Sequence, residues 1–216
     1  PAAGRRPFPN RCHPPGGSAP SRRQTDRRCL RGGRCARTGA CAGRWFERAG
    51  QHPRREKAHG ADFAKDAIKR GAVAVLTDAD GASKIKGVPV IVSAHPRRAA
   101  GVISAWFYSE PMRDLYSVGV TGTNGKTTVT TLLHQIMSAA GRESGLIGTV
   151  ETRIGSETLA SKRTTPESSD LQALSAVMRE RHMRNLVMEV SSHAITLERI
   201  RGSHFAVVAF INLSQD

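Results

Sequence analysis

The first 57 residues lack most of the side chains from which a protein core is built. This segment contains no valine, isoleucine, methionine or tyrosine, and Leu30 is its only leucine. Such a stretch cannot bury enough apolar surface to offset the conformational entropy of its chain. We therefore expect residues 1–57 to be of low order. They would be a disordered basic tail, a nucleic-acid-binding arm, or non-native sequence from a reading-frame error, which their mixture of Arg, Pro, Gly, Ala and Cys favours.

Basic charge is concentrated in the same segment. The 216-residue chain has a formal net charge of +15, and residues 1–57 hold fifteen basic residues against three acidic ones. A strongly basic segment is the electrostatic footprint of a nucleic-acid-binding protein. Because the rest of the chain carries little net charge, nucleic acid is not the expected partner. A basic nucleic-acid-binding protein acting through residues 1–57 remains an alternative.

Cysteine and long apolar runs are scarce outside this segment. All four cysteines lie within it, namely Cys12, Cys29, Cys35 and Cys41. Their spacing contains no CxxC pair of the kind that is typical of zinc sites. No apolar run approaches the roughly twenty residues needed to span a bilayer. The beginning of the sequence also lacks the apolar core of a secretory signal. We therefore expect a cytoplasmic protein with no membrane partner.

From Ala58 onward, short apolar runs alternate with amphipathic stretches, which predicts an α/β fold with a mostly parallel sheet. Glu110-Pro111 marks a linker between one domain over 58–110 and a second over 111–216. A helix is predicted to start at Thr165, with its hydroxyl as the cap and Pro166 in the first turn. The other predicted helices span 62–71, 96–108 and 127–140. Strands are predicted over 72–77, 88–92, 115–120 and, as buried strands, 186–190 and 205–211, with extended structure over 146–154.

The most informative stretch is a glycine-rich turn between a predicted strand and a predicted helix, Val118-Gly-Val-Thr-Gly-Thr-Asn-Gly-Lys-Thr-Thr128. Glycines allow the backbone amides to approach phosphate oxygens, and a helix N-terminus favours an anion. Lys126 is placed to reach the β- and γ-phosphates, as the catalytic lysine, and the hydroxyl of Thr127 to ligate Mg²⁺. Val120 replaces the first glycine of the general phosphate-loop pattern. The candidate ATP-binding residues are Gly122, Thr123, Asn124, Gly125, Lys126, Thr127 and Thr128.

The segment Gly-Thr-Asn-Gly-Lys-Thr-Thr at 122–128 resembles the signature of the Mur ligases and of related folylpolyglutamate and cyanophycin synthetases. The resemblance implies a P-loop central domain and a partial N-terminal domain for the UDP-linked substrate over 58–110. It also implies a shared chemistry that requires ATP and Mg²⁺. In that chemistry a substrate carboxylate is phosphorylated, an amine attacks the acyl phosphate, and an amide forms.

Two further stretches resemble the MurE-type members of that family. Thr164-Thr165-Pro166-Glu167 resembles their TTPE segment, which implies that Thr164 and Thr165 contact UDP-N-acetylmuramoyl-dipeptide. Met188 to Ala194 resembles their MEVSSH segment. That likeness implies that Glu189, expected to be exposed at a strand end, holds Mg²⁺, and that Ser191 and Arg199 bind the same substrate. Taken singly, Ser191 reads equally well as a turn former and Arg199 as part of a solvated face.

The resemblance implies an ATP-dependent ligase that adds the third amino acid, diaminopimelate or lysine, to UDP-N-acetylmuramoyl-L-alanyl-D-glutamate in cell-wall synthesis. Another Mur-like ligase or a cyanophycin-type ligase is the alternative within the enzyme class. The family's metal-binding histidine, carbamylated lysine and C-terminal domain would lie beyond Asp216. We therefore expect this chain to be an inactive fragment.

Overall fold

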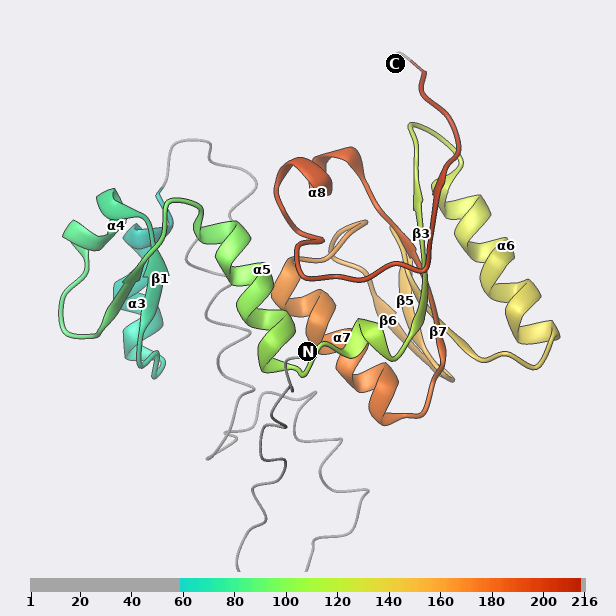
Figure 1. Cartoon of the computed structure of the whole chain (residues 1–216), viewed down its shortest axis with the longest axis horizontal. Helices are drawn as coiled ribbons and strands as arrows, with labels where there is room; N and C mark the ends of the chain where they lie inside the picture. The colour runs from blue at the N-terminus through green and yellow to red at the C-terminus, as the bar shows by residue number, and fades with distance from the viewer. Residues whose placement is uncertain (1–58, 215–216) are drawn as a thin grey trace, which may run out of the picture. The chain divides into compact units, whose positions relative to one another are not determined.

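The computed structural model describes residues 59–214. The predictions for residues 1–57, including the four cysteines and the basic arm, lie outside this range. Residues 59–110 contain two parallel strands flanked by helices (Figure 1). The elements are the 3₁₀ helix η1 (Gly60–Phe63), α3 (Ala64–Lys69), β1 (Val75–Thr77), α4 (Ala79–Lys84), β2 (Val90–Val92) and α5 (Pro96–Phe107).

Residues 111–214 form a six-stranded sheet with strand order β6-β5-β4-β7-β3-β8. Strands β4, β7, β3 and β8 are parallel, whereas β5 and β6 add an antiparallel edge. This arrangement confirms the predicted α/β fold with a mostly parallel sheet. The elements are η2 (Pro111–Arg113), β3 (Tyr116–Thr121), α6 (Lys126–Ala139), β4 (Ser144–Ile147), β5 (Glu151–Ile154), β6 (Glu157–Ala160), α7 (Ser168–Glu180), β7 (Asn185–Glu189), α8 (Ser192–Thr196) and β8 (Val207–Phe210).

The core of this sheet lies between its strands and the helix α7. Leu171 and Met178 on α7 are fully buried against Leu186 and Met188 of β7 and Ile147 of β4. Helix α6 covers the opposite face of the sheet (Figure 1). Burial of both faces explains why β7 reads as a continuous apolar run instead of an alternating one.

The carboxyl ends of the four parallel strands meet at one edge of the sheet. At this edge β3 leads into the glycine-rich turn, β4 into Gly148-Thr149, β7 ends at Glu189, and β8 continues to Asn212. In open α/β sheets, ligands bind beyond the carboxyl ends of the strands. The candidate functional site is therefore expected at this edge.

Two predictions of local structure were wrong, and a third was correct only in part. Helix α7 begins at Ser168 with Glu167 at its N-cap, because the hydroxyl of Thr165 is engaged by β7 and the turn after it instead of capping the helix. Strand β8 is not buried, since it forms the edge of the described sheet. The stretch 146–154 is extended in β4 and β5 as predicted, but a turn between these two strands reverses the chain.

Helix α5 packs against the loop at Gly202 through a face of small residues. Its buried face consists of Gly101, Ser104 and Ala105. A side chain added at Gly202 would lie 2.5 Å from the carbonyl oxygen of Gly101, so the loop and the helix approach as closely as glycine permits. The division of the chain at residue 110 remains a prediction. No helix within residues 59–214 combines the length and the apolar character needed to cross a membrane.

Candidate functional site

The glycine-rich turn after β3 wraps around the start of α6. Gly122 has φ +149° and Gly125, the N-cap of α6, has φ +83°, both in a region that disfavours side chains. A Cβ at Gly122 would lie 2.6 Å from Cγ1 of Ile211, so a larger residue does not fit there. The first amides of α6 have no partner within the helix. The turn therefore presents the amides and positive dipole end that a phosphate group requires.

The side chain of Lys126 folds back onto this turn. Its Nζ donates to the carbonyl oxygens of Gly122 at 2.6 Å and Thr123 at 2.9 Å. The ammonium group is thereby held over the turn. A phosphate oxygen, being charged, is a stronger acceptor than either carbonyl.

Glu189 ends β7 at the same edge of the sheet. The expectation that it would be exposed was wrong, because its side chain is 1% exposed. The backbone N–H of Thr149 donates to Oε1 of Glu189 at 2.8 Å, and the Thr149 hydroxyl lies 3.0 Å from Oε2. The same hydroxyl lies 3.0 Å from that of Thr164. The end of β4 therefore fixes the carboxylate and links it to the predicted substrate residue Thr164.

Thr165 ties the predicted substrate residues to β7. It is fully buried, and its hydroxyl donates to the carbonyl oxygen of Glu189 at 2.9 Å while accepting from the N–H of Ser191 at 3.0 Å. The hydroxyl of Ser191 accepts from the N–H of Ala194 at 3.1 Å and so caps α8. Both hydroxyls are therefore engaged within the protein.

Arg199 does not lie on a solvated face. It is 7% exposed, and its Nε lies 3.0 Å from Oε1 of Glu167, while Nη1 donates to the carbonyl oxygen of Thr165 at 3.5 Å. Arg163 reaches the same Glu167 oxygen at 2.9 Å. Burial is the largest influence on the pKa of Arg199 and lowers it, whereas the Glu167 carboxylate opposes that shift. Two guanidinium groups thus converge on one buried carboxylate, leaving an excess of one positive charge.

The structure brings Thr164, Thr165, Ser191, Arg199 and Glu189 into one hydrogen-bonded network, and places the phosphate loop at the same strand ends. Sequence reasoning missed Thr149, Glu167 and Asn212. A polar residue directly after an apolar strand was the available signal for Thr149 and Asn212. Glu167 belongs to the TTPE segment, but its two arginine partners are visible only in the fold.

The oxygen atoms at the strand ends are suitable ligands for Mg²⁺. This ion prefers a few oxygen ligands from the protein together with phosphate oxygens and water. The carboxylate of Glu189 has lone pairs beyond the two used by Thr149, and Thr127 offers a hydroxyl at the start of α6. Within the described residues, no cluster of three or more His, Cys, Asp or Glu side chains could hold a metal by itself. The residues present therefore fit a phosphate-bound Mg²⁺ better than a closed structural metal site.

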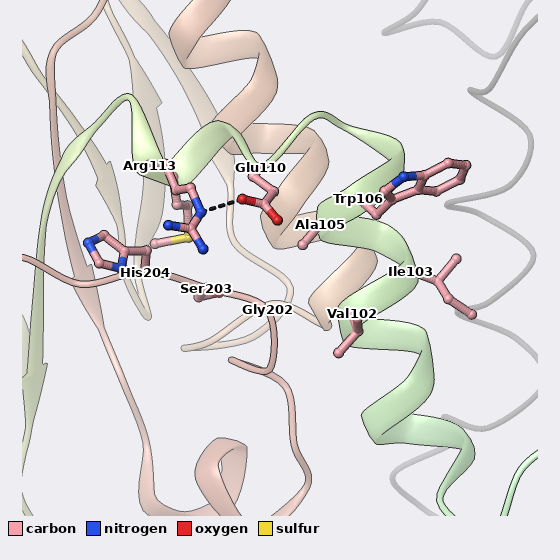
Figure 2. Close-up of a pocket in the computed structure, with 10 residues that line it drawn as sticks. Val102, Ile103, Ala105, Trp106, Glu110, Arg113, Gly202, Ser203 and His204 are labelled. Atoms are coloured by element: carbon pink, nitrogen blue, oxygen red, sulfur yellow. Dashed lines mark ion pairs between the residues drawn. The ribbon is translucent and has the colours of Figure 1, made fainter. Parts of the chain in front are cut away.

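A cavity of about 460 Å³ lies elsewhere, between α5, η2 and the loop at residues 202–204. Figure 2 shows Glu110 and Arg113 paired on its wall, with His204 and Ser203 opposite α5 and with Trp106 and Ile103 pointing away. None of the predicted site residues lines it. The candidate functional site therefore lies at the strand ends and not in this cavity.

Comparison with known proteins gives the class to which this geometry belongs. Residues 120–216 match the Mur ligase middle domain. The resemblance of the sequence to the Mur ligases is thereby confirmed over these residues.

Relatives of the chain include MurE-type ligases. The chain is 51% identical over 160 residues to UDP-N-acetylmuramoyl-L-alanyl-D-glutamate--2,6-diaminopimelate ligase of Streptomyces avermitilis, covering 73% of this chain and 31% of the relative. The ligase of the same name from Corynebacterium efficiens is 50% identical over 162 residues, with the same two coverages. A solved structure of a ligase of that name matches with a TM-score of 0.61 and 25% identity, over 73% of this chain and 31% of that one. The chain thus spans about a third of the length of these relatives.

Proposed function

We propose that the chain supplies the ATP-binding part of a ligase that adds the third amino acid to UDP-N-acetylmuramoyl-L-alanyl-D-glutamate in peptidoglycan synthesis. One observation carries this proposal. The phosphate loop after β3 and the Thr165–Arg199 network after β7 lie at the same edge of adjacent parallel strands. That edge can hold a triphosphate beside an acidic substrate.

The reaction joins a carboxylate to an amine at the expense of ATP. The γ-phosphoryl group moves to the D-glutamate carboxylate, which gives an acyl phosphate and ADP. The incoming amine then attacks the acyl carbon, and phosphate leaves as the amide forms. Because negative charge accumulates on the transferred group, catalysis depends mainly on positioning and on cationic partners.

The phosphate loop has the donors for the first step. We assign ATP binding to residues 122–128, where the backbone amides at the start of α6 would donate hydrogen bonds to the phosphate oxygens. Lys126 would exchange its two carbonyl partners for phosphate oxygens and stabilise the charge on the transferred group. Thr127 and Glu189 would hold Mg²⁺, which supplies electrostatic stabilisation of the phosphate oxygens when bound.

The network after β7 would hold the acidic substrate. Arg199 and Arg163 bring one positive charge more than Glu167 neutralises, which favours a carboxylate or phosphate group. Because Thr165 is buried with its hydroxyl engaged on both sides, we assign it to positioning Ser191. Thr164, Ser191 and Arg199 remain the proposed contacts to the substrate.

The relatives named above are diaminopimelate ligases, which favours diaminopimelate over lysine as the amino acid. We further propose that residues 58–110 contribute part of the UDP-substrate domain, that residues 111–216 belong to the ATP-binding domain, and that the protein acts in the cytoplasm.

Equilibrium binding of a fluorescent N-methylanthraniloyl-ATP to the purified chain with Mg²⁺ tests the proposal. We expect saturable binding that unlabelled ATP competes away. Lys126→Ala should weaken it by about tenfold or more, as expected for the loss of a charge-assisted contact. Lys86→Ala, at a distant lysine in the 59–110 part, is the matched control and should bind like the wild type. Absence of binding by the wild-type chain, or equal binding by Lys126→Ala, would refute the nucleotide assignment.

A further inference from the structure

The described segment that follows β8 is hydrogen-bonded to the end of β3 and to the phosphate loop through Ile211, Asn212 and Ser214. Pairing of β3 with β8 continues past the strand ends. The N–H of Ile211 donates to the carbonyl oxygen of Thr121 at 3.0 Å, and the N–H of Thr123 donates to the carbonyl oxygen of Asn212 at 3.3 Å. Beyond this point Ser214 takes over. Its N–H donates to the Thr123 hydroxyl at 3.1 Å, and that hydroxyl donates to the carbonyl oxygen of Ser214 at 3.1 Å.

The side chain of Asn212 makes the closest contact with the loop. Its Oδ1 accepts from the backbone N–H of Asn124 at 3.0 Å, and its Nδ2 donates to the carbonyl oxygen of the same residue at 2.9 Å. A carboxamide offers one acceptor and two donors in one plane. It therefore bonds both backbone groups of Asn124 at once, as an additional strand would.

We propose that Asn212 is a positioning residue of the nucleotide site, whose carboxamide fixes the backbone of Asn124 and so shapes the phosphate loop before nucleotide binds. The inference rests on the proposed nucleotide-binding function of that loop. It also divides the loop amides into two groups. The amide of Asn124 is occupied by Asn212, so phosphate oxygens are left to the amides at the start of α6.

The benefit of this contact is preorganisation. Asn124 and Gly125 are exposed, Gly122 and Thr123 are partly exposed, and both glycines have positive φ. Such a backbone has many conformations available, and ordering it would reduce the affinity for nucleotide. A side chain that holds the loop in place removes part of that entropic cost. The contact is made by a segment 88 residues distant in the sequence, so it depends on correct pairing of β8.

The test measures two quantities in the full chain. One is the dissociation constant of N-methylanthraniloyl-ATP with Mg²⁺, and the other is the exchange rate of the Asn124 amide in the ligand-free protein. For Asn212→Ala we expect about tenfold weaker binding, as for two exposed hydrogen bonds, and faster amide exchange. Asn212→Asp keeps the size but sets an oxygen against the Asn124 carbonyl, so it should bind at least as poorly. Leu213→Ala alters a neighbouring side chain that is 84% exposed, and should match the wild type in both measurements.

The outcomes separate this inference from the function on which it rests. If the wild-type chain binds no nucleotide, the proposed function fails and the inference fails with it. If the wild type binds and Asn212→Ala binds within twofold of it, the inference alone is overturned. A loss of affinity with unchanged Asn124 exchange also overturns it, because the loop backbone was then not held by this side chain. Melting temperatures should fall by no more than about 4 °C, so a larger drop that accounts for the lost binding counts against positioning as well.

Discussion

The phosphate loop and the Glu167–Arg199 network lie at the same edge of the sheet but are built differently. The loop is partly exposed and acts through its backbone, with Lys126 and Asn212 bonded to main-chain groups. The network is buried and acts through side chains, with Glu167 1% and Arg199 7% exposed. Water screens and replaces contacts in the first region, whereas it has little access to Glu167 and Arg199 in the second. Substitutions in the network should therefore reduce folding stability, and substitutions in the loop should mainly reduce nucleotide binding.

The largest effect on stability is expected for Glu167→Gln. This change removes the charge that compensates Arg199 and Arg163, and an uncompensated buried guanidinium costs about 3–5 kcal/mol. Urea unfolding measures the change. The control is Glu157→Gln, which removes the charge that pairs with Arg181. The side chain of Glu157 is 49% exposed, so this change should cost less than about 1 kcal/mol. Equal costs for the two variants would show that burial of Glu167 and Arg199 does not strengthen their interaction.

Gly122→Ala should have the next largest effect, and in the other region. Its Cβ would lie 2.6 Å from Ile211 Cγ1 and 3.1 Å from the backbone of Asn212, at a φ of +149°. We expect a loss of about 2 kcal/mol in stability and loss of detectable nucleotide binding in the same fluorescence titration. Gly141→Ala, at φ +70° with nothing within 4 Å, is the matched control and should retain binding. Normal binding by Gly122→Ala would mean that the loop tolerates displacement.

Thr165→Val tests whether the hydroxyl positions the turn after β7. Valine keeps the shape but leaves the N–H of Ser191 without its acceptor, which should cost about 1–3 kcal/mol in urea unfolding. Thr165→Ser keeps the hydroxyl and should recover much of this loss. The same change at the exposed Thr158 of β6 should be nearly neutral. A Thr165→Val variant as stable as the wild type would contradict the bridging role.

The same contrast explains how far the sequence could predict the molecule. The loop lies between neighbouring elements, and its flanking strand and helix were predicted at 115–120 and 127–140 against the observed Tyr116–Thr121 and Lys126–Ala139. Apolar periodicity and glycine chemistry are local signals, so they suffice here. By contrast, the start of α7 was misplaced because the cap signal of Thr165-Pro166 competed with tertiary hydrogen bonds to β7.

The exposure of β8 and the long-range contacts could not be predicted. The apolar run of β8 reads the same for a central strand and for an edge strand, since pairing partners are absent from a local pattern. Asn212 meets Asn124 only because β8 pairs with β3, and Glu167 meets Arg199 only because α7 and α8 begin at the same sheet edge. The family segments indicated which residues matter, but not which of them are held by others.

The smallest effect concerns pH and lies outside both regions. Nδ1 of His134 on α6 lies 2.8 Å from the hydroxyl of Ser144, and burial, followed by the charge of Arg153, lowers the pKa of this histidine. As the pH falls, the unfolded chain therefore takes up a proton at this histidine before the folded chain does. The contribution of His134 to stability is present above about pH 6.5 and is lost as the pH falls from there through the lowered pKa of the folded state. His134→Gln should flatten the stability difference between about pH 7.5 and pH 5, a change below about 1 kcal/mol. Ser144→Ala removes the partner but keeps the titrating ring, so it should lower stability at both pH values and preserve the slope. If His134→Gln leaves the pH slope unchanged, the loss of stability at low pH originates at other groups, and the carboxylates become the next to examine.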